Sequence, residues 1–114
     1  MEMNNDFKLD VVSVRLVKEA PIFSDVKITT PEIATWLIGK YLCEMDREVL
    51  CVVNLKSDNT PINCTMASVG SLNQSLVSPR EIFKTSILSN AANMLLIHNH
   101  PSGSLNPSKE DIEI

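Results

Sequence analysis

The stretch MLLIHNHPSGSLNPSKED, residues 94–111, carries the strongest structural and chemical signal in the chain. Its first four residues, Met94 to Ile97, form a short apolar run that predicts a central β-strand. His98 and His100 follow directly, so their imidazoles are expected on one side of the exposed strand end. The sequence has only 2 histidines, and both lie in this tripeptide. That concentration favours a ligand role over two loop histidines that bond backbone groups.

A carboxylate further along the chain completes a metal-ligand set. Asp111 follows the histidines, and two nitrogens with one oxygen are the three protein ligands of a catalytic zinc that keeps a fourth position open. Water on such a zinc ionises near neutral pH, so the pattern predicts a zinc-dependent hydrolase. Two alternatives stay open. Ser108 to Asp111 also fits S-x-x-D, in which Asp111 caps a helix starting at Ser108. Glu110 is a neighbouring carboxylate, but about 100° of helical rotation separates the two, so only one can face the histidines.

Two further side chains are candidates for the chemistry itself. Ser108 is either a helix N-cap or a hydroxyl that donates to a developing oxyanion. A hydrolase also needs a general base, and Glu48 is a candidate because it adjoins the most buried predicted strand. The other candidate glutamates are Glu44, Glu81, which a capping box at residues 78–81 explains, and Glu110.

Composition limits the remaining classes. With 114 residues the chain is at most one small domain, and 44% apolar residues suffice for a core. The net charge of −4 and the lack of a long basic run give no support for a nucleic-acid patch. No apolar stretch approaches the roughly 20 residues of a membrane span, so a cytoplasmic location is expected. The odd number of cysteines, 3, predicts reduced, buried thiols and no disulfide framework.

Periodicity and turn residues predict an alternating order of strands and helices, hence an α/β sandwich with a mixed sheet. Alternation at Val12, Val14 and Leu16 predicts a first strand. Thr30 and Pro31 open a helix whose apolar stripe is formed by Ile33, Trp36, Leu37 and Tyr41. The remaining expected elements are a buried strand at residues 49–53, a return strand from Ile62 after a turn at residues 57–61, a helix from Pro79 to about Asn90 with a stripe of Phe83, Ile87 and Ala91, the strand at residues 94–97, and a helix start at Ser108.

The pattern H-x-H-P, six residues, S-x-x-D is met by His98, His100, Pro101, Ser108 and Asp111 without a gap. It resembles the JAMM signature of the JAB/MPN metalloprotease domains, and HNHPSGSLNPSKED with the upstream SPREIFK resembles the RadC branch of that family. The resemblance implies a cytidine-deaminase-like α/β sandwich, with a mixed sheet flanked by helices. It implies Zn²⁺ held by His98, His100 and Asp111. It further implies Glu48 as the proton shuttle and Ser108 as the residue that stabilises the tetrahedral intermediate.

The implied activity is zinc-dependent hydrolysis of peptide or isopeptide bonds. The alternatives are a non-catalytic RadC-like binding module associated with DNA repair or DNA metabolism, and a metal-dependent nuclease. The expected partner is a peptide or isopeptide substrate; nucleic acid is unsupported by charge, no membrane is expected, and homo-oligomers stay open. The resemblance extends over residues 11–114, after a flexible start at residues 1–10. Because the family normally continues with a helix and another strand, the chain is expected to lack the C-terminal end of the domain.

Overall fold

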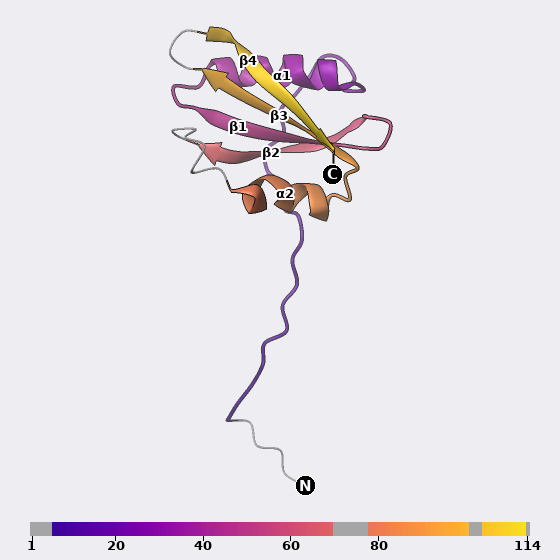
Figure 1. Cartoon of the computed structure of the whole chain (residues 1–114), viewed down its shortest axis with the longest axis vertical. Helices are drawn as coiled ribbons and strands as arrows, with labels where there is room; N and C mark the ends of the chain where they lie inside the picture. Colours follow the sequence, from indigo (N-terminus) through magenta and orange to yellow (C-terminus); the bar gives the residue numbers. More distant parts are fainter. Residues whose placement is uncertain (1–5, 70–77, 101–103, 114) are drawn as a thin grey trace.

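Four strands form one sheet with a helix packed on each face (Figure 1). The computed structural model describes residues 6–69, 78–100 and 104–113, with side chains for residues 6–67 and 78–99. The elements along the chain are α1 (Pro31–Cys43), β1 (Val49–Leu55), β2 (Pro61–Val69), α2 (Pro79–Leu88), β3 (Asn93–His100) and β4 (Ser104–Glu113). The strand order across the sheet is β2-β1-β3-β4. The predicted α/β class is confirmed, but each described strand pairing is antiparallel, whereas a mixed sheet was predicted.

Strand β1 lies at the centre of the fold. All of its residues are buried, and it pairs with β2 along one edge and with β3 along the other. Val49, Cys51 and Val53 pack toward α1, whereas Leu50 and Val52 pack toward α2. Burying an aliphatic side chain of this size stabilises the fold by about 1.5–3 kcal/mol. The predicted buried strand and its antiparallel return strand are both confirmed.

Helix α1 begins as predicted but is rotated relative to the predicted stripe. The Thr30 side chain accepts a hydrogen bond from the Ile33 backbone N–H at 3.2 Å, and Pro31 occupies the first turn. The buried face consists of Ala34, Leu37, Ile38, Gly39 and Leu42. Trp36 is 55% exposed and Tyr41 is 43% exposed, so these two members of the predicted stripe were wrong, whereas Leu37 is buried and Ile33 is half-buried. The ring of Trp36 instead carries the Lys40 ammonium 4.3 Å from its centroid, a cation–π contact on the outer face.

Helix α2 starts at the predicted cap and ends slightly earlier than predicted. The Ser78 side chain accepts from the Arg80 backbone N–H at 3.2 Å. The chain leaves the helix through Asn90, whose φ of 56° is left-handed, a common way to end a helix. Phe83 packs against the core, but Ile87 is 69% exposed, so that part of the predicted stripe was wrong.

The segment after the histidines is a strand and not the start of a helix. Residues 104–113 pair antiparallel with β3, so the helix predicted from Ser108 is not found. The pairing supplies hydrogen-bond partners along the outer edge of β3. Pro107 is tolerated because β4 is an edge strand and its register with β3 shifts between His98 and His100.

The predicted first strand is also not found. Residues 7–24 have no helix or strand, and Figure 1 shows this segment running away from the sheet. Val12 is 82% exposed and Val14 is 71% exposed, so their alternation has no strand edge to pair with. Among the described residues, none of the helices has the length and apolar character needed to cross a membrane.

Candidate metal centre

The pairing of β1 with β3 brings the predicted general base and the first histidine to the same end of the sheet. Leu50 is the register partner of His98, and directly opposed residues share one face of a sheet. Glu48 lies two positions before Leu50, immediately before the first residue of β1. Both Glu48 and His98 are half-buried. Two residues that are fifty positions apart in sequence therefore lie at adjoining strand ends.

Asn99 connects these two strand ends through its side chain, and sequence reasoning missed it. It is 3% exposed and lies between the two histidines. Its Oδ1 accepts from the Val49 backbone N–H at 2.8 Å, and its Nδ2 donates to the carbonyls of Leu42 and Arg47, each at 3.0 Å. A detectable signal was present in the sequence. Position 99 continues the core-facing alternation of Leu95 and Ile97, where a polar residue needs an explanation.

The other predicted site residues are located here by backbone register, since their side chains lie outside the described set. His98 and His100 occupy alternate positions of β3, and the β3–β4 register shifts between them. Ser108 of β4 is the register partner of His98. Asp111 is the partner of Leu95, three positions further along, which is about 10 Å at the rise of a strand. The register thus brings Ser108 to His98 but does not bring Asp111 there. Pro101 lies outside the described residues.

The donor types at this sheet end suit zinc. Imidazole nitrogen and carboxylate oxygen are both favoured zinc ligands, and alternate strand positions are a suitable spacing for two histidines. The half-buried setting of His98 would limit access of water to an ion while leaving one side open. Among the side chains that the structure describes, no three His, Cys, Asp or Glu residues form a metal-binding group. His100 and Asp111 are outside that set, so the predicted ligand triad stays a prediction.

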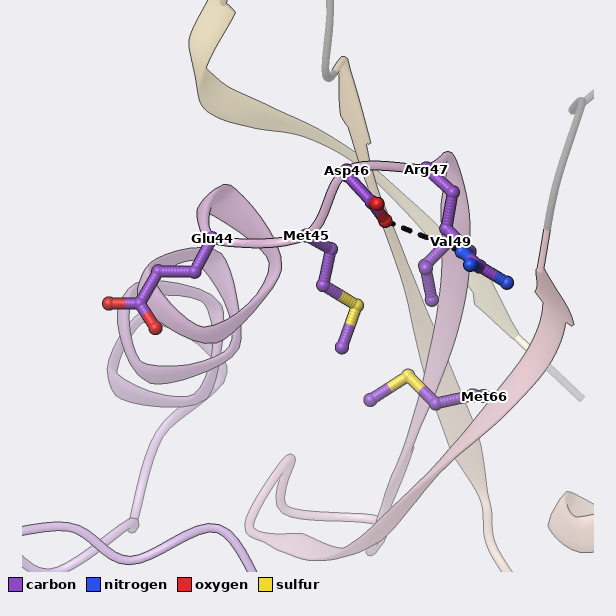
Figure 2. A pocket seen from close by; sticks show the side chains of 6 residues that line it. All are labelled: Glu44, Met45, Asp46, Arg47, Val49 and Met66. Atoms are coloured by element: carbon purple, nitrogen blue, oxygen red, sulfur yellow. Dashed lines mark hydrogen bonds and ion pairs between the residues drawn. The ribbon is translucent and has the colours of Figure 1, made fainter.

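A surface pocket of about 450 Å³ lies on the other face of the sheet. It is lined by residues 44–47 of the α1–β1 connection, Val49 and Met66. Figure 2 shows the side chains of Met45 and Met66 directed toward each other, while the Glu44 side chain points away from Met45. Met45 and Met66 pack against the core cluster under α1, whereas His98 pairs with Leu50 on the α2 face. The pocket therefore shares the α1–β1 connection with Glu48 but does not contain His98.

The thiols differ from one another in burial and acidity. All three cysteines are free, as predicted, but only Cys51 is buried, whereas Cys43 and Cys64 are exposed. A hydrogen bond between the Cys51 and Cys64 side chains, together with burial, raises the pKa of Cys51 above the ordinary thiol range. The same hydrogen bond lowers the pKa of Cys64. Both lie on the α1 face, away from His98, so neither is a candidate ligand of this centre.

Comparison with known proteins connects this arrangement to a bacterial family. The sequence model of the RadC-like JAB domain matches residues 28–114. A UPF0758 protein of Clostridium beijerinckii is 47% identical over 94 residues, covering 82% of this chain and 41% of the relative. A UPF0758 protein of Clostridium acetobutylicum is 46% identical over 92 residues, covering 81% and 40%. One from Desulfitobacterium hafniense is 42% identical over 100 residues, covering 88% and 44%. The chain thus spans less than half the length of these relatives.

Proposed function

Because the chain belongs to the RadC-like JAB domain family, we propose that its β1–β3 sheet end is the centre of a zinc-dependent hydrolase of peptide or isopeptide bonds. The observation that supports the proposal is the register that sets Leu50 against His98, since Glu48 lies two positions before Leu50 in the chain. The family is associated with hydrolases in general, and the UPF0758 relatives carry no named activity. Cleavage of a peptide or isopeptide bond therefore goes beyond what family membership implies.

The proposed ligands are His98, His100 and Asp111. Zinc, when bound, would supply a Lewis acid that polarises a carbonyl and acidifies a water molecule at neutral pH. The β3 backbone supports the two histidines directly, because they occupy alternate positions at the end of a buried strand. The role of Asp111 rests on its spacing from the histidines and not on the β4 register. A ligand role requires residues 104–113 to leave the pairing with β3, and metal binding would supply the free energy for that rearrangement.

Glu48 and Ser108 are the proposed catalytic side chains. A carboxylate oxygen of Glu48 would take a proton from the attacking water and pass it to the leaving amine. The Ser108 hydroxyl would donate a hydrogen bond to the oxyanion of the tetrahedral intermediate; like the role of Asp111, this role rests on the spacing of the sequence motif and not on the β4 register. The half-buried position of Glu48 suits a group that must reach substrate yet stay fixed.

The proposal is tested with purified protein and a panel of peptide and isopeptide substrates. We expect about one zinc per chain and amide cleavage that a chelator abolishes and added zinc restores. The His98→Ala, His100→Ala double variant should lose most of its zinc and all of its cleavage activity. Full zinc content in the double variant would refute the ligand assignment. Zinc bound without cleavage of any amide would instead favour a non-catalytic RadC-like binding module, the alternative that fits the same family.

A further inference from the structure

We propose that Asn99 is a positioning residue that holds the Glu48 backbone at the sheet end that contains His98. The effect of this positioning on catalysis rests on the proposed function. Asn99 contacts neither substrate nor metal in this scheme. It lies on the opposite face of β3 from His98, because the two are neighbours in the strand. Its effect on the site is exerted through the backbone on both sides of Glu48.

The hydrogen bonds of Asn99 bracket one residue. The carbonyl of Arg47 belongs to the peptide group before Glu48, and the N–H of Val49 belongs to the peptide group after it. One carboxamide holds both, by donation at 3.0 Å and acceptance at 2.8 Å. With both flanking peptide planes fixed, the Cα of Glu48 has little freedom to move. The Glu48 side chain therefore starts from a defined point relative to β3.

The third hydrogen bond fixes the segment that leads into Glu48. Nδ2 of Asn99 also donates to the carbonyl of Leu42, in the last turn of α1, at 3.0 Å. The Leu42 carbonyl also accepts from the Met45 backbone N–H at 3.1 Å, so Asn99 adds a second donor at this helix terminus. The connection from Leu42 to Val49 is consequently tied to β3 at both of its ends. The residues between them line the surface pocket on the α1 face.

An apolar residue would be the simpler way to fill position 99. Leu95 and Ile97, the preceding residues on the same face, are 1% and 0% exposed and belong to the core. A buried amide is costly unless its hydrogen-bonding groups are paired, and here both ends of the carboxamide are paired. The bonds go to a loop backbone that carries the predicted general base. An apolar side chain at position 99 would fill the space but could not hold that backbone by hydrogen bonds.

The test compares Asn99→Ala with a matched control, Asn54→Ala. Asn54 is also a buried asparagine, 0% exposed, and its side chain bonds those of Asn63, Thr85 and Ser86. It lies toward the other end of β1, opposite Met94. Both variants remove a buried amide from the same sheet, so global destabilisation should be similar. Only Asn99→Ala removes the bonds around Glu48.

The first readout is amide hydrogen exchange, which needs neither metal nor substrate. With exchange corrected for the measured unfolding free energy, the Val49 amide should exchange on the order of tenfold faster in Asn99→Ala than in Asn54→Ala. Equal protection of Val49 in the two variants would overturn the proposal. If Asn99→Ala does not fold, Asn99→Ser removes the amide donors with a smaller loss of volume, and the same comparison applies.

The second readout is a double-mutant cycle on activity. Asn99→Ala should lower kcat by about 10- to 100-fold with little change in KM, since a misplacement near 1 Å costs on the order of 100-fold. In a Glu48→Gln background it should lower kcat no further, because it acts through Glu48. An equal loss in both backgrounds would overturn the positioning role. If the wild-type protein cleaves no amide, the proposed function fails, while hydrogen exchange still decides whether Asn99 fixes the Glu48 backbone.

Discussion

Replacing Glu48 by glutamine separates proton transfer from metal binding and from folding. Glutamine has nearly the same volume but cannot accept a proton at neutral pH. The bonds that hold this backbone run from Asn99 to the peptide groups of Arg47 and Val49 and do not involve the Glu48 side chain. Because Glu48 is half-buried and those bonds survive the substitution, the stability cost should be within about 1 kcal/mol. Zinc content should be unchanged, since Glu48 is not a proposed ligand.

The expected loss of rate follows from removing a general base. Such a change costs about 10²- to 10⁴-fold in rate, which corresponds to roughly 2.7–5.4 kcal/mol of transition-state stabilisation. The assay is steady-state kinetics on a peptide or isopeptide substrate, with zinc content and thermal unfolding measured on the same samples. Glu44→Gln is the matched control, because Glu44 is an exposed carboxylate at the end of α1 four residues away. Full activity in Glu48→Gln together with none in Glu44→Gln would refute the assignment of the base.

Two further outcomes are expected. Asp111→Asn should lose most of its bound zinc with little change in the stability of the metal-free protein. Metal analysis and denaturant unfolding measure these two quantities. An unchanged zinc content would mean that Asp111 is not a ligand and would make Glu110 the next candidate. In the folded protein, Cys64 should be alkylated by iodoacetamide at a pH below the ordinary thiol range, because its hydrogen bond with Cys51 lowers its pKa. Cys51 should be alkylated only when the protein unfolds, because the same hydrogen bond and burial raise its pKa. Mass spectrometry of the alkylated protein against pH checks this, and equal labelling of both thiols would contradict it.

Sequence patterns predicted the centre of this fold well and its ends poorly. The run at β1 and the alternation at β2 were sufficient because a fully buried strand and a hairpin are local, strongly patterned features. The strand predicted around Val12 was wrong. Alternating apolar residues show that a segment is able to form a strand, but they do not show that a second strand is available to pair with it. Ser108 and Asp111 fit a helix cap, but residues 104–113 pair with β3. A capping pattern depends on neighbouring residues only, so it cannot show that the edge of β3 is available for strand pairing.

The candidate site shows the same division between local and long-range information. Spacing selected the two histidines as candidate ligands, and the adjoining buried strand together with the resemblance selected Glu48; the β1–β3 register brings the Glu48 and His98 strand ends together. The alternation of β3 marks Asn99 as a polar residue in a core-facing position, but it does not identify the residues about fifty positions away to which Asn99 bonds. The rotation of the α1 stripe has a similar origin. Ala34 and Leu42 are buried by the sheet they meet, while Trp36 and Tyr41 lie on the exposed side of α1.

The long sequence separation between β1 and β3 has a consequence for folding. The β1–β2 hairpin closes over a short turn, whereas β1 meets β3 only after the intervening chain has returned, so the second pairing should form later. A nascent or partly unfolded chain can then contain the hairpin without having Glu48 near His98. The hydrolytic centre would be assembled only in the completed domain. Long-range topology would in this way keep an unfinished chain from attacking amide bonds, including those of its own backbone.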